Sequence, residues 1–187
     1  MNLLELNRAA LDLTLELWAE LDEEHLGLPT PCAGWTVREL MGHQVEVTAG
    51  FAAAALGTAP GGPASDDALV AYRAAADAAT AAFRADGFLD RTAVFPGFGP
   101  RPARELVAAH FVDNLVHAWD LRRALGVDAA LDPGLAGAAH RMALRYPTTP
   151  DVRGPGAPFA HPVGVPEDAP VTDRLVGLLG RSPSWPA

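Results

Sequence analysis

Residues 110–120 read His-Phe-Val-Asp-Asn-Leu-Val-His-Ala-Trp-Asp, and the fold that we expect for this chain is arranged around them. They lie within the longest uninterrupted helical pattern in the second half of the sequence. Successive residues of an α-helix are turned by ~100°, so Asp113 and His117 lie one turn and about 6 Å apart on the same face. A carboxylate and an imidazole with this spacing can bind one divalent ion if another helix supplies a third ligand. The same spacing also occurs in ordinary surface pairs.

The composition restricts the class of protein. The chain has 187 residues, a formal net charge of −9, 49% hydrophobic residues and a sequence pI of about 5.0. This length suits a single domain over residues 1–187 with one well-buried core. Because the chain is acidic and has no run of Lys or Arg, we expect no nucleic-acid partner.

The targeting and redox features are those of a cytoplasmic protein. The N-terminus lacks a basic region followed by an apolar run, and no charge-free stretch of roughly 18 residues occurs, so we expect neither export nor a membrane partner. Cys32 is the single cysteine, which excludes an internal disulfide and fits a reducing compartment. We expect Cys32 to be a small buried loop residue.

Four long segments have the spacing of amphipathic helices. They cover residues 3 to about 23, 37 to about 56, 66 to about 85, and 102 to about 125. Thr36, followed three residues later by Glu39, forms a capping box and predicts where the second helix begins. With short connections between them, these segments predict an all-α protein, an antiparallel four-helix bundle.

The remaining segments are shorter or irregular. Residues 87–102 are either a short extended piece or a loop folded over the bundle. Asp132 followed by proline predicts a fifth, short helix to about residue 146. Residues 147–170 are rich in Pro and Gly, and residues 172–180 predict a final short helix. We expect the C-terminal segment 147–187 to pack on the bundle as part of the same domain.

His43 is the candidate third ligand. It lies in the second helix, seven residues after the Thr36 cap, among apolar neighbours. By itself it is also compatible with a buried, hydrogen-bonded histidine. Together with Asp113 and His117, however, it gives two imidazoles and one carboxylate, a set that holds a divalent ion and leaves positions open for water or substrate. Zinc is the expected ion, with nickel as the alternative.

The two other polar residues of the central stretch share the stripe of Asp113 and His117. At ~100° per residue this stripe lies opposite the apolar face of the helix, so it either is solvated or lines a cleft between helices. His110 is about 10 Å from His117 along the axis and is expected in the surrounding shell, in a pocket wall or at the surface. Asp120 either orients the His117 ring through its other nitrogen or is a surface acid.

Three further residues are candidates for the surroundings of the site. Glu46, one turn after His43, is either a general base near the metal or a solvated or salt-bridged acid. Trp35 and Trp119 are either core aromatics or pocket walls. The sequence has neither a Gly-x-Ser-x-Gly elbow nor a Gly-rich strand-to-helix turn, which argues against a serine hydrolase and a nucleotide-binding protein.

Three blocks of the sequence together resemble a known family. These are Thr-Pro-Cys-Ala-Gly-Trp-Thr-Val-Arg-Glu-Leu-Met-Gly-His at 30–43, Asp-Asn-Leu-Val-His-Ala-Trp-Asp-Leu at 113–121, and the closing block 163–181. In this order they resemble a group of metal-binding proteins of the DinB-like superfamily, to which the N-terminal domain of mycothiol-dependent maleylpyruvate isomerase is related. The resemblance implies a DinB-like four-helix bundle with a divalent metal in a cleft, held by His43, Asp113 and His117.

The resemblance also implies a function. A metal-dependent enzyme of this type would use a low-molecular-weight thiol such as mycothiol in transfer or isomerisation on a small electrophile, or hydrolyse its substrate with a metal-activated water if no thiol binds. The isomerase has glutamate where this chain has Asp113, and residues 147–187 do not resemble its additional C-terminal domain. We therefore do not expect maleylpyruvate to be the substrate. The alternative is a non-catalytic bundle, a binding or stress protein with a structural or vestigial metal site, and a homodimer is compatible with either.

Overall fold

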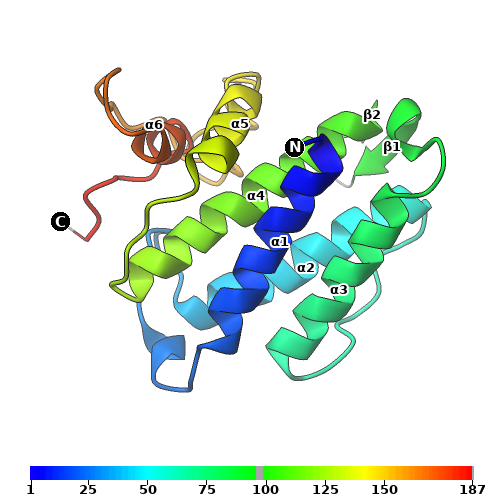
Figure 1. The fold of residues 1–187 in the computed structure, drawn as a ribbon, viewed down its shortest axis with the longest axis horizontal. Helices are drawn as coiled ribbons and strands as arrows, with labels where there is room; N and C mark the ends of the chain where they lie inside the picture. The colour runs from blue at the N-terminus through cyan, green and yellow to red at the C-terminus, as the bar shows by residue number, and fades with distance from the viewer. Residues whose placement is uncertain (96–98, 187) are drawn as a thin grey trace.

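The computed structural model describes residues 1–95 and 99–186, and its body is a bundle of long helices (Figure 1). The four long helices are α1 (Leu3–Ala19), α2 (Val37–Leu56), α3 (Ala68–Phe83) and α4 (Ala103–Ala124). Of the two shorter helices, α5 (Pro133–Ala143) lies beside α4, and α6 (Val171–Leu178) packs against α5. The predicted predominantly helical fold is thereby confirmed. None of the described helices has the length and apolar character that a membrane span requires.

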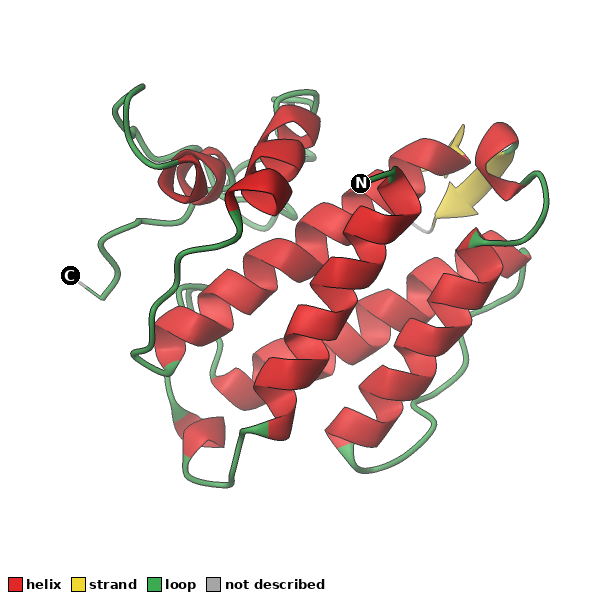
Figure 2. Ribbon diagram, in the orientation of Figure 1, coloured by secondary structure: helices red, strands yellow, loops and turns green. Residues whose placement is uncertain are grey.

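The segment between α3 and α4 contains the strands of the described chain. A short 3-10 turn, Phe88–Asp90, leads into β1 (Thr92–Phe95), which pairs antiparallel with β2 (Gly99–Pro102). Figure 2 shows this hairpin at one end of the bundle. The sequence allowed an extended piece or a loop here, and the structure has an extended hairpin. Our prediction for residues 96–98 lies outside the described residues.

Local hydrogen bonds set the helix boundaries. The Glu39 amide donates to the Thr36 hydroxyl oxygen at 3.4 Å, and the Thr36 amide donates to the Glu39 carboxylate at 2.7 Å, so the predicted capping box is confirmed. The Asp132 side chain accepts from the first amides of α5. Pro102 is the residue before α4 rather than its first residue. Since α1 ends at Ala19, it is shorter than its apolar spacing predicted.

The order of the core contacts gives the direction of each helix. Tyr72, near the start of α3, belongs to the same hydrophobic cluster as Val37 at the start of α2. Phe83, at the end of α3, packs with Ala55 at the end of α2. The helices α2 and α3 are therefore parallel, and the connection 57–67 returns along the bundle (Figure 1). The pair α1 and α4 runs in the opposite direction, which is a four-helix bundle with a crossover connection. The expected antiparallel arrangement therefore holds between the two pairs of helices but not within each pair.

The helix α4 is buried around most of its circumference. Its apolar face, with Phe111, Leu115 and Trp119, joins residues of α1, α5 and α6 in one cluster. Its polar stripe faces inward too, because His110 and Asp120 are 0% exposed and His117 is 5% exposed. The stripe is thus not a solvated face. Burying polar groups is costly unless they find partners, so their contacts indicate what they do.

Candidate metal centre

Three candidate ligands from two helices converge beside the start of α2. His117 Nε2 lies 3.6 Å from Asp113 Oδ1, and His43 Nε2 lies 4.0 Å from the same oxygen. The imidazole rings of His43 and His117 meet edge to face, with centroids 5.0 Å apart. One donor atom from each of the three residues lies within 4.8 Å of the others, so a single ion between them could touch all three.

The carboxylate of Asp113 has an open coordination position. Its Oδ2 is buried and has no hydrogen-bond partner among the described residues. Burial by itself would raise the pKa of Asp113, but the charge and hydrogen bonds of His117, and those of His43, hold that pKa well below its usual range. A buried, ionised carboxylate oxygen without a donor fits a divalent cation.

The Asp113 carboxylate also shifts the pKa of His117. Burial lowers the pKa of His117, but the charge and hydrogen bond of Asp113, together with hydrogen bonds to Asp120 and Cys32, outweigh burial and raise this pKa well above its usual value. In the metal-free protein a proton on His117 therefore offsets the charge of Asp113. Because a metal ligand must be a neutral imidazole, an incoming cation would displace that proton from Nε2.

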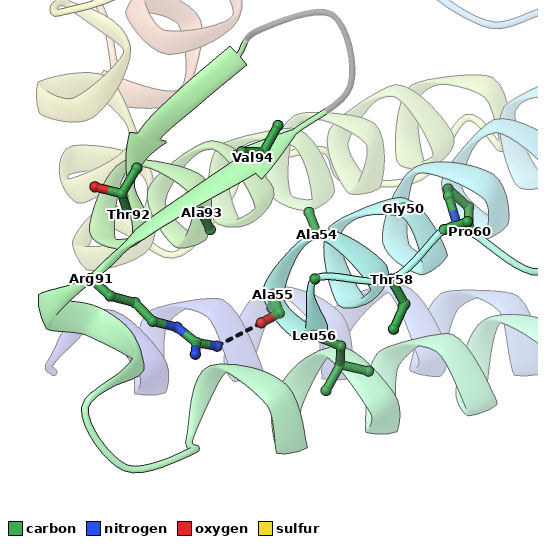
Figure 3. Close-up of a pocket in the computed structure, with 12 residues that line it drawn as sticks. Gly50, Ala54, Ala55, Leu56, Thr58, Pro60, Arg91, Thr92, Ala93 and Val94 are labelled. Carbon is green, nitrogen blue, oxygen red and sulfur yellow. Dashed lines mark hydrogen bonds between the residues drawn. The ribbon is translucent and has the colours of Figure 1, made fainter.

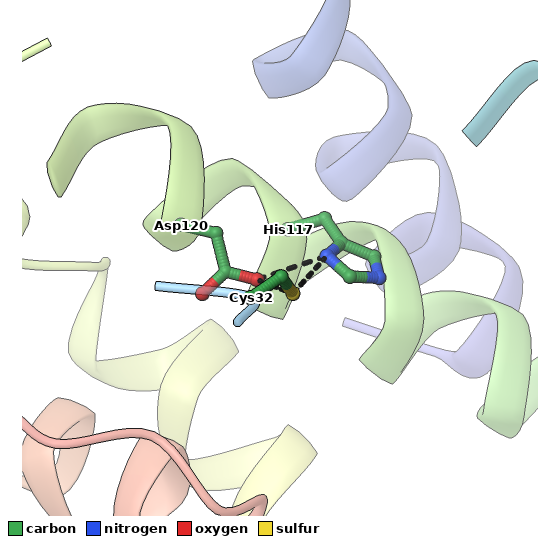
Figure 4. Close-up of side chains that lie close together, drawn as sticks. All are labelled: Cys32, His117 and Asp120. Carbon is green, nitrogen blue, oxygen red and sulfur yellow. Dashed lines mark hydrogen bonds and ion pairs between the residues drawn. The ribbon is translucent and has the colours of Figure 1, made fainter. Parts of the chain in front are cut away.

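A second group of side chains lies behind His117 (Figure 4). His117 Nδ1 donates to Asp120 Oδ2 at 2.9 Å, and the Cys32 thiol lies 3.3 Å from the same oxygen. Arg181, which follows α6, donates from Nη2 to Asp120 Oδ2 at 2.9 Å and to Cys32 Sγ at 3.1 Å. Burial raises the pKa of Asp120, but the charges and hydrogen bonds of Arg181 and His117 together outweigh burial and lower this pKa to about 2.

Cys32, His117 and Asp120 also have donor atoms close enough to surround an ion. Here, however, the Arg181 guanidinium already occupies the position of a cation, since it binds both the sulfur and the carboxylate. A divalent ion would have to displace a buried ion pair. The set His43, Asp113 and His117 has no such resident cation among the described residues and keeps an unpaired oxygen, so we assign the candidate ion site there.

A tight turn before α2 presents Cys32 and Trp35 to the site. The Trp35 amide donates to the Cys32 carbonyl at 2.9 Å, and Gly34 has a φ of +83°, which glycine adopts without steric cost. The Thr30 hydroxyl lies within hydrogen-bonding distance of the carbonyls of Cys32 and Trp35, at 3.3 and 3.0 Å. The Trp35 ring then lies 4.7 Å from the His43 ring and 6.2 Å from that of His117. Trp35 is thus a wall of the site.

The other predicted residues lie elsewhere. His110 is bonded to Asn7 Oδ1 through Nδ1 at 2.8 Å and lies 3.3 Å from the Thr48 hydroxyl through Nε2, between α1 and α2. Trp119 belongs to the core cluster around α5 and α6. Glu46 is exposed on α2. His110 and Trp119 are therefore core residues, and neither contributes a wall to the centre formed by His43, Asp113 and His117.

A separate hollow of about 540 Å³ lies at the opposite end of α2 (Figure 3). It is lined by the end of α2, the following loop and strand β1. Arg91 is the charged residue in its lining, and its guanidinium donates to the Ala55 carbonyl at 2.7 Å. This hollow offers small apolar surfaces rather than metal ligands.

Sequence reasoning missed Arg181. It also expected Cys32 to be a buried loop residue, whereas Cys32 is partly exposed and contacts both Asp120 and Arg181. Arg181 is 61 residues from Asp120, and Cys32 is 88 residues from it, so no local spacing relates them. The one available signal was that both lie in blocks that carry the family resemblance.

The fold and the site together define a DinB-like helical bundle with two histidines and one aspartate at its centre. The chain belongs to the family of the mycothiol maleylpyruvate isomerase N-terminal domain, whose family model matches residues 7–122. The resemblance drawn from the three sequence blocks is thereby confirmed.

Relatives cover nearly the whole chain. Two uncharacterized proteins of Mycobacterium tuberculosis, Rv0738 of strain H37Rv and MT0763 of strain CDC 1551, are each 37% identical over 186 residues. Each match covers 97% of this chain and 99% of the relative. The similarity therefore includes the C-terminal segment that carries Arg181.

Two crystal structures have the same fold. The mycothiol-dependent maleylpyruvate isomerase matches with a TM-score of 0.56, and a mutant of that enzyme matches with a TM-score of 0.59. Each is 15% identical to this chain, and each match covers 76% of this chain and 68% of the other. At 15% identity this similarity shows a shared arrangement of the helices and nothing beyond the fold.

Proposed function

We propose that the protein binds a divalent ion, zinc in the first place, through His43, Asp113 and His117. The observation that carries this proposal is the buried Asp113 carboxylate, which lies between two imidazoles and keeps one oxygen without a hydrogen-bond partner among the described residues. Two nitrogens and a carboxylate oxygen suit zinc, and three protein ligands leave a position open for a further ligand.

We further propose that this further ligand is a low-molecular-weight thiol of the mycothiol type, and that the reaction is a thiol-dependent isomerisation or transfer on a small electrophile. Membership in a family named for a mycothiol-dependent isomerase supports the thiol and the class of reaction. The chemistry that a divalent ion supplies here is to lower the pKa of a thiol, so that the nucleophile is available at neutral pH.

The residues of the chain have distinct tasks in this proposal. Asp120 holds the Nδ1–H of His117, which turns Nε2 toward Asp113. Trp35 covers one side of the site, since its ring lies against both imidazoles. The side chains of His43 and Asp113 are 29% and 22% exposed, so the side of the site that they form is open to an incoming ligand.

Metal analysis of protein made without a polyhistidine tag tests the proposal. Wild-type protein should carry stoichiometric metal, and His117→Ala should lose it because a ligand is removed. His140→Ala is the matched control, since His140 lies on α5 and outside the site. Metal-free wild-type protein whose melting temperature does not change with added zinc or a chelator would contradict the metal site.

Thiol binding is tested separately by calorimetry with mycothiol. We expect binding to zinc-loaded wild-type protein and none to zinc-treated His117→Ala. Equal binding to both proteins would argue for a thiol site without metal. Binding of metal but of no thiol would favour the alternative, a non-catalytic bundle with a structural metal.

A further inference from the structure

Arg181 connects the C-terminal segment to the candidate metal centre. It follows α6 (Val171–Leu178), and its side chain is 9% exposed. Its guanidinium donates from Nε to Asp120 Oδ1 at 3.3 Å and from Nη2 to Asp120 Oδ2 at 2.9 Å. A third bond, from Nη1 to the Leu179 carbonyl at 3.0 Å, fixes the guanidinium to its own segment.

The two parallel bonds fix the plane of the Asp120 carboxylate. A planar guanidinium that binds both oxygens restricts the rotation of a carboxylate, which a single point charge does not. Asp120 is 0% exposed, so water does not reach its oxygens. Without Arg181, Asp120 would be a buried charge facing one imidazole and one thiol.

The orientation of the Asp120 carboxylate determines the orientation of the His117 ring, the candidate metal ligand. Asp120 Oδ2 receives the His117 Nδ1–H at 2.9 Å, and the opposite nitrogen of the same ring lies 3.6 Å from Asp113 Oδ1. A rotation of the carboxylate would turn the ring and move Nε2 away from the position that it shares with Asp113 and His43. Partners that hold a ligand imidazole through its second nitrogen affect metal affinity strongly.

We propose that Arg181 is a positioning residue of the metal centre, acting through Asp120 on His117, so that the C-terminal segment completes the site formed by the bundle. This inference rests on the proposed metal function. It means that the segment after α5 contributes to metal affinity as well as to stability.

A purely structural role for Arg181 makes a different prediction, and Arg153 provides the matched control. Arg153 is 3% exposed and donates to the Leu178 carbonyl at 2.7 Å. It therefore holds the same segment, but its guanidinium contacts the Leu178 carbonyl and the Phe159 ring rather than residues of the candidate metal centre. Losing Arg153 should loosen the segment without releasing Asp120.

Zinc affinity, measured by competition with a chromophoric chelator, separates the two roles. Arg181→Met should weaken zinc binding roughly 10- to 100-fold, as removal of such outer partners does. Arg153→Met should lower the melting temperature but keep the zinc affinity within about twofold of wild type, since the outer partners of the ligands remain. Arg181→Lys should restore part of the affinity, because it keeps the charge but loses the two-point geometry.

A double-mutant cycle tests the path through Asp120. In an Asp120→Asn background, Arg181→Met should cause little further loss of zinc affinity, because the group on which Arg181 acts is already changed. Full additivity of the two substitutions would overturn the proposal, as would equal losses of affinity in Arg181→Met and Arg153→Met.

A readout without metal keeps the inference distinct from the proposed function. In nitrogen-15 spectra of metal-free protein, the His117 Nδ1 proton should exchange slowly in wild type and in Arg153→Met, but should broaden in Arg181→Met. An unchanged signal in Arg181→Met overturns the positioning role. Wild-type protein that binds no zinc contradicts the proposed function, whereas the imidazole signal still decides whether Arg181 orients His117.

Discussion

Lowering the pH from 7 to 5 should destabilise this protein through His110, a buried histidine that is not part of the candidate metal centre. Burial lowers the pKa of His110 to about 4, and the charge of Asp113 opposes this only in part. Its Nδ1–H donates to Asn7 Oδ1, and the rings of Phe51 and Phe83 lie 4.8 and 5.4 Å away. A proton on Nε2 would face the Thr48 hydroxyl in an otherwise apolar environment.

The sign of the effect follows from proton uptake. Between its ordinary pKa of 6.5 and its folded pKa of about 4, His110 binds a proton in the unfolded chain but not in the folded one. Stability is therefore fully present above pH 6.5 and is lost as the pH falls. At pH 5 the loss amounts to about 2 kcal/mol, and it levels off at roughly 3 kcal/mol below pH 4.

The other groups with shifted pKa values do not disturb a comparison of wild type with a His110 variant between pH 5 and 6.5. The raised pKa of His117 gives stability that is already complete below 6.5 and is lost only at higher pH. The lowered pKa values of Asp113 and Asp120 change the stability only at a pH near or below 3.8, the usual pKa of an aspartate. The lowered pKa of His140 acts in the same direction as that of His110, but its contribution is common to wild type and a His110 variant and cancels in the comparison.

The assay is urea unfolding of wild type and His110→Asn at pH 7 and pH 5. The variant should be less stable at pH 7, because it leaves a cavity and weakens the bond to Thr48. Between the two pH values, however, wild type should lose about 2 kcal/mol more than the variant. Equal losses in the two proteins would refute the argument, and so would a direct measurement of a His110 pKa near 6.5.

Three further predictions concern local geometry and metal binding. Thr36→Ala removes the hydroxyl of the α2 capping box and should lower the free energy of unfolding by about 1 kcal/mol in urea titrations, whereas no measurable loss would mean that packing alone fixes the start of α2. Gly34→Ala places a Cβ at a φ of +83°, so it should lower the free energy of unfolding by roughly 1–2 kcal/mol and weaken zinc binding by shifting Trp35. A wild-type free energy of unfolding together with wild-type zinc affinity would contradict the role of this turn. Zinc bound at His117 would displace a proton whose pKa is raised above its usual value, so the apparent zinc affinity should fall as the pH is lowered from 7 to 6, by up to roughly tenfold. A pH-independent affinity in buffers of equal ionic strength would contradict the raised pKa.

The sequence was sufficient for features that depend on neighbouring residues. The Thr36 capping box and the Asp132 cap form between groups three or fewer residues apart, so their residue types alone predict them. The same holds for Asp113 and His117, since one helical turn brings them together wherever the helix lies. We expected His43 to lie near Asp113 and His117 from its residue type and the family resemblance. Its actual distance to Asp113 depends on the packing of α2 on α4.

The directions of the helices and the partners of buried groups were decided by tertiary structure alone. An apolar stripe indicates that a helix is buried on that face, but it does not state which helix covers it or in which direction, so the parallel pair α2 and α3 was not predictable. The sequence pattern of α4 was equally compatible with a solvated polar face and with a polar face buried against another helix, because periodicity does not distinguish water from a buried partner. Arg181 reaches Asp120 across 61 residues of sequence. The sequence by itself thus determined the main helices and two adjacent candidate ligands. Packing determined the position of the third candidate ligand and the ion pair behind His117, because such contacts depend on how distant segments meet and not on their local pattern.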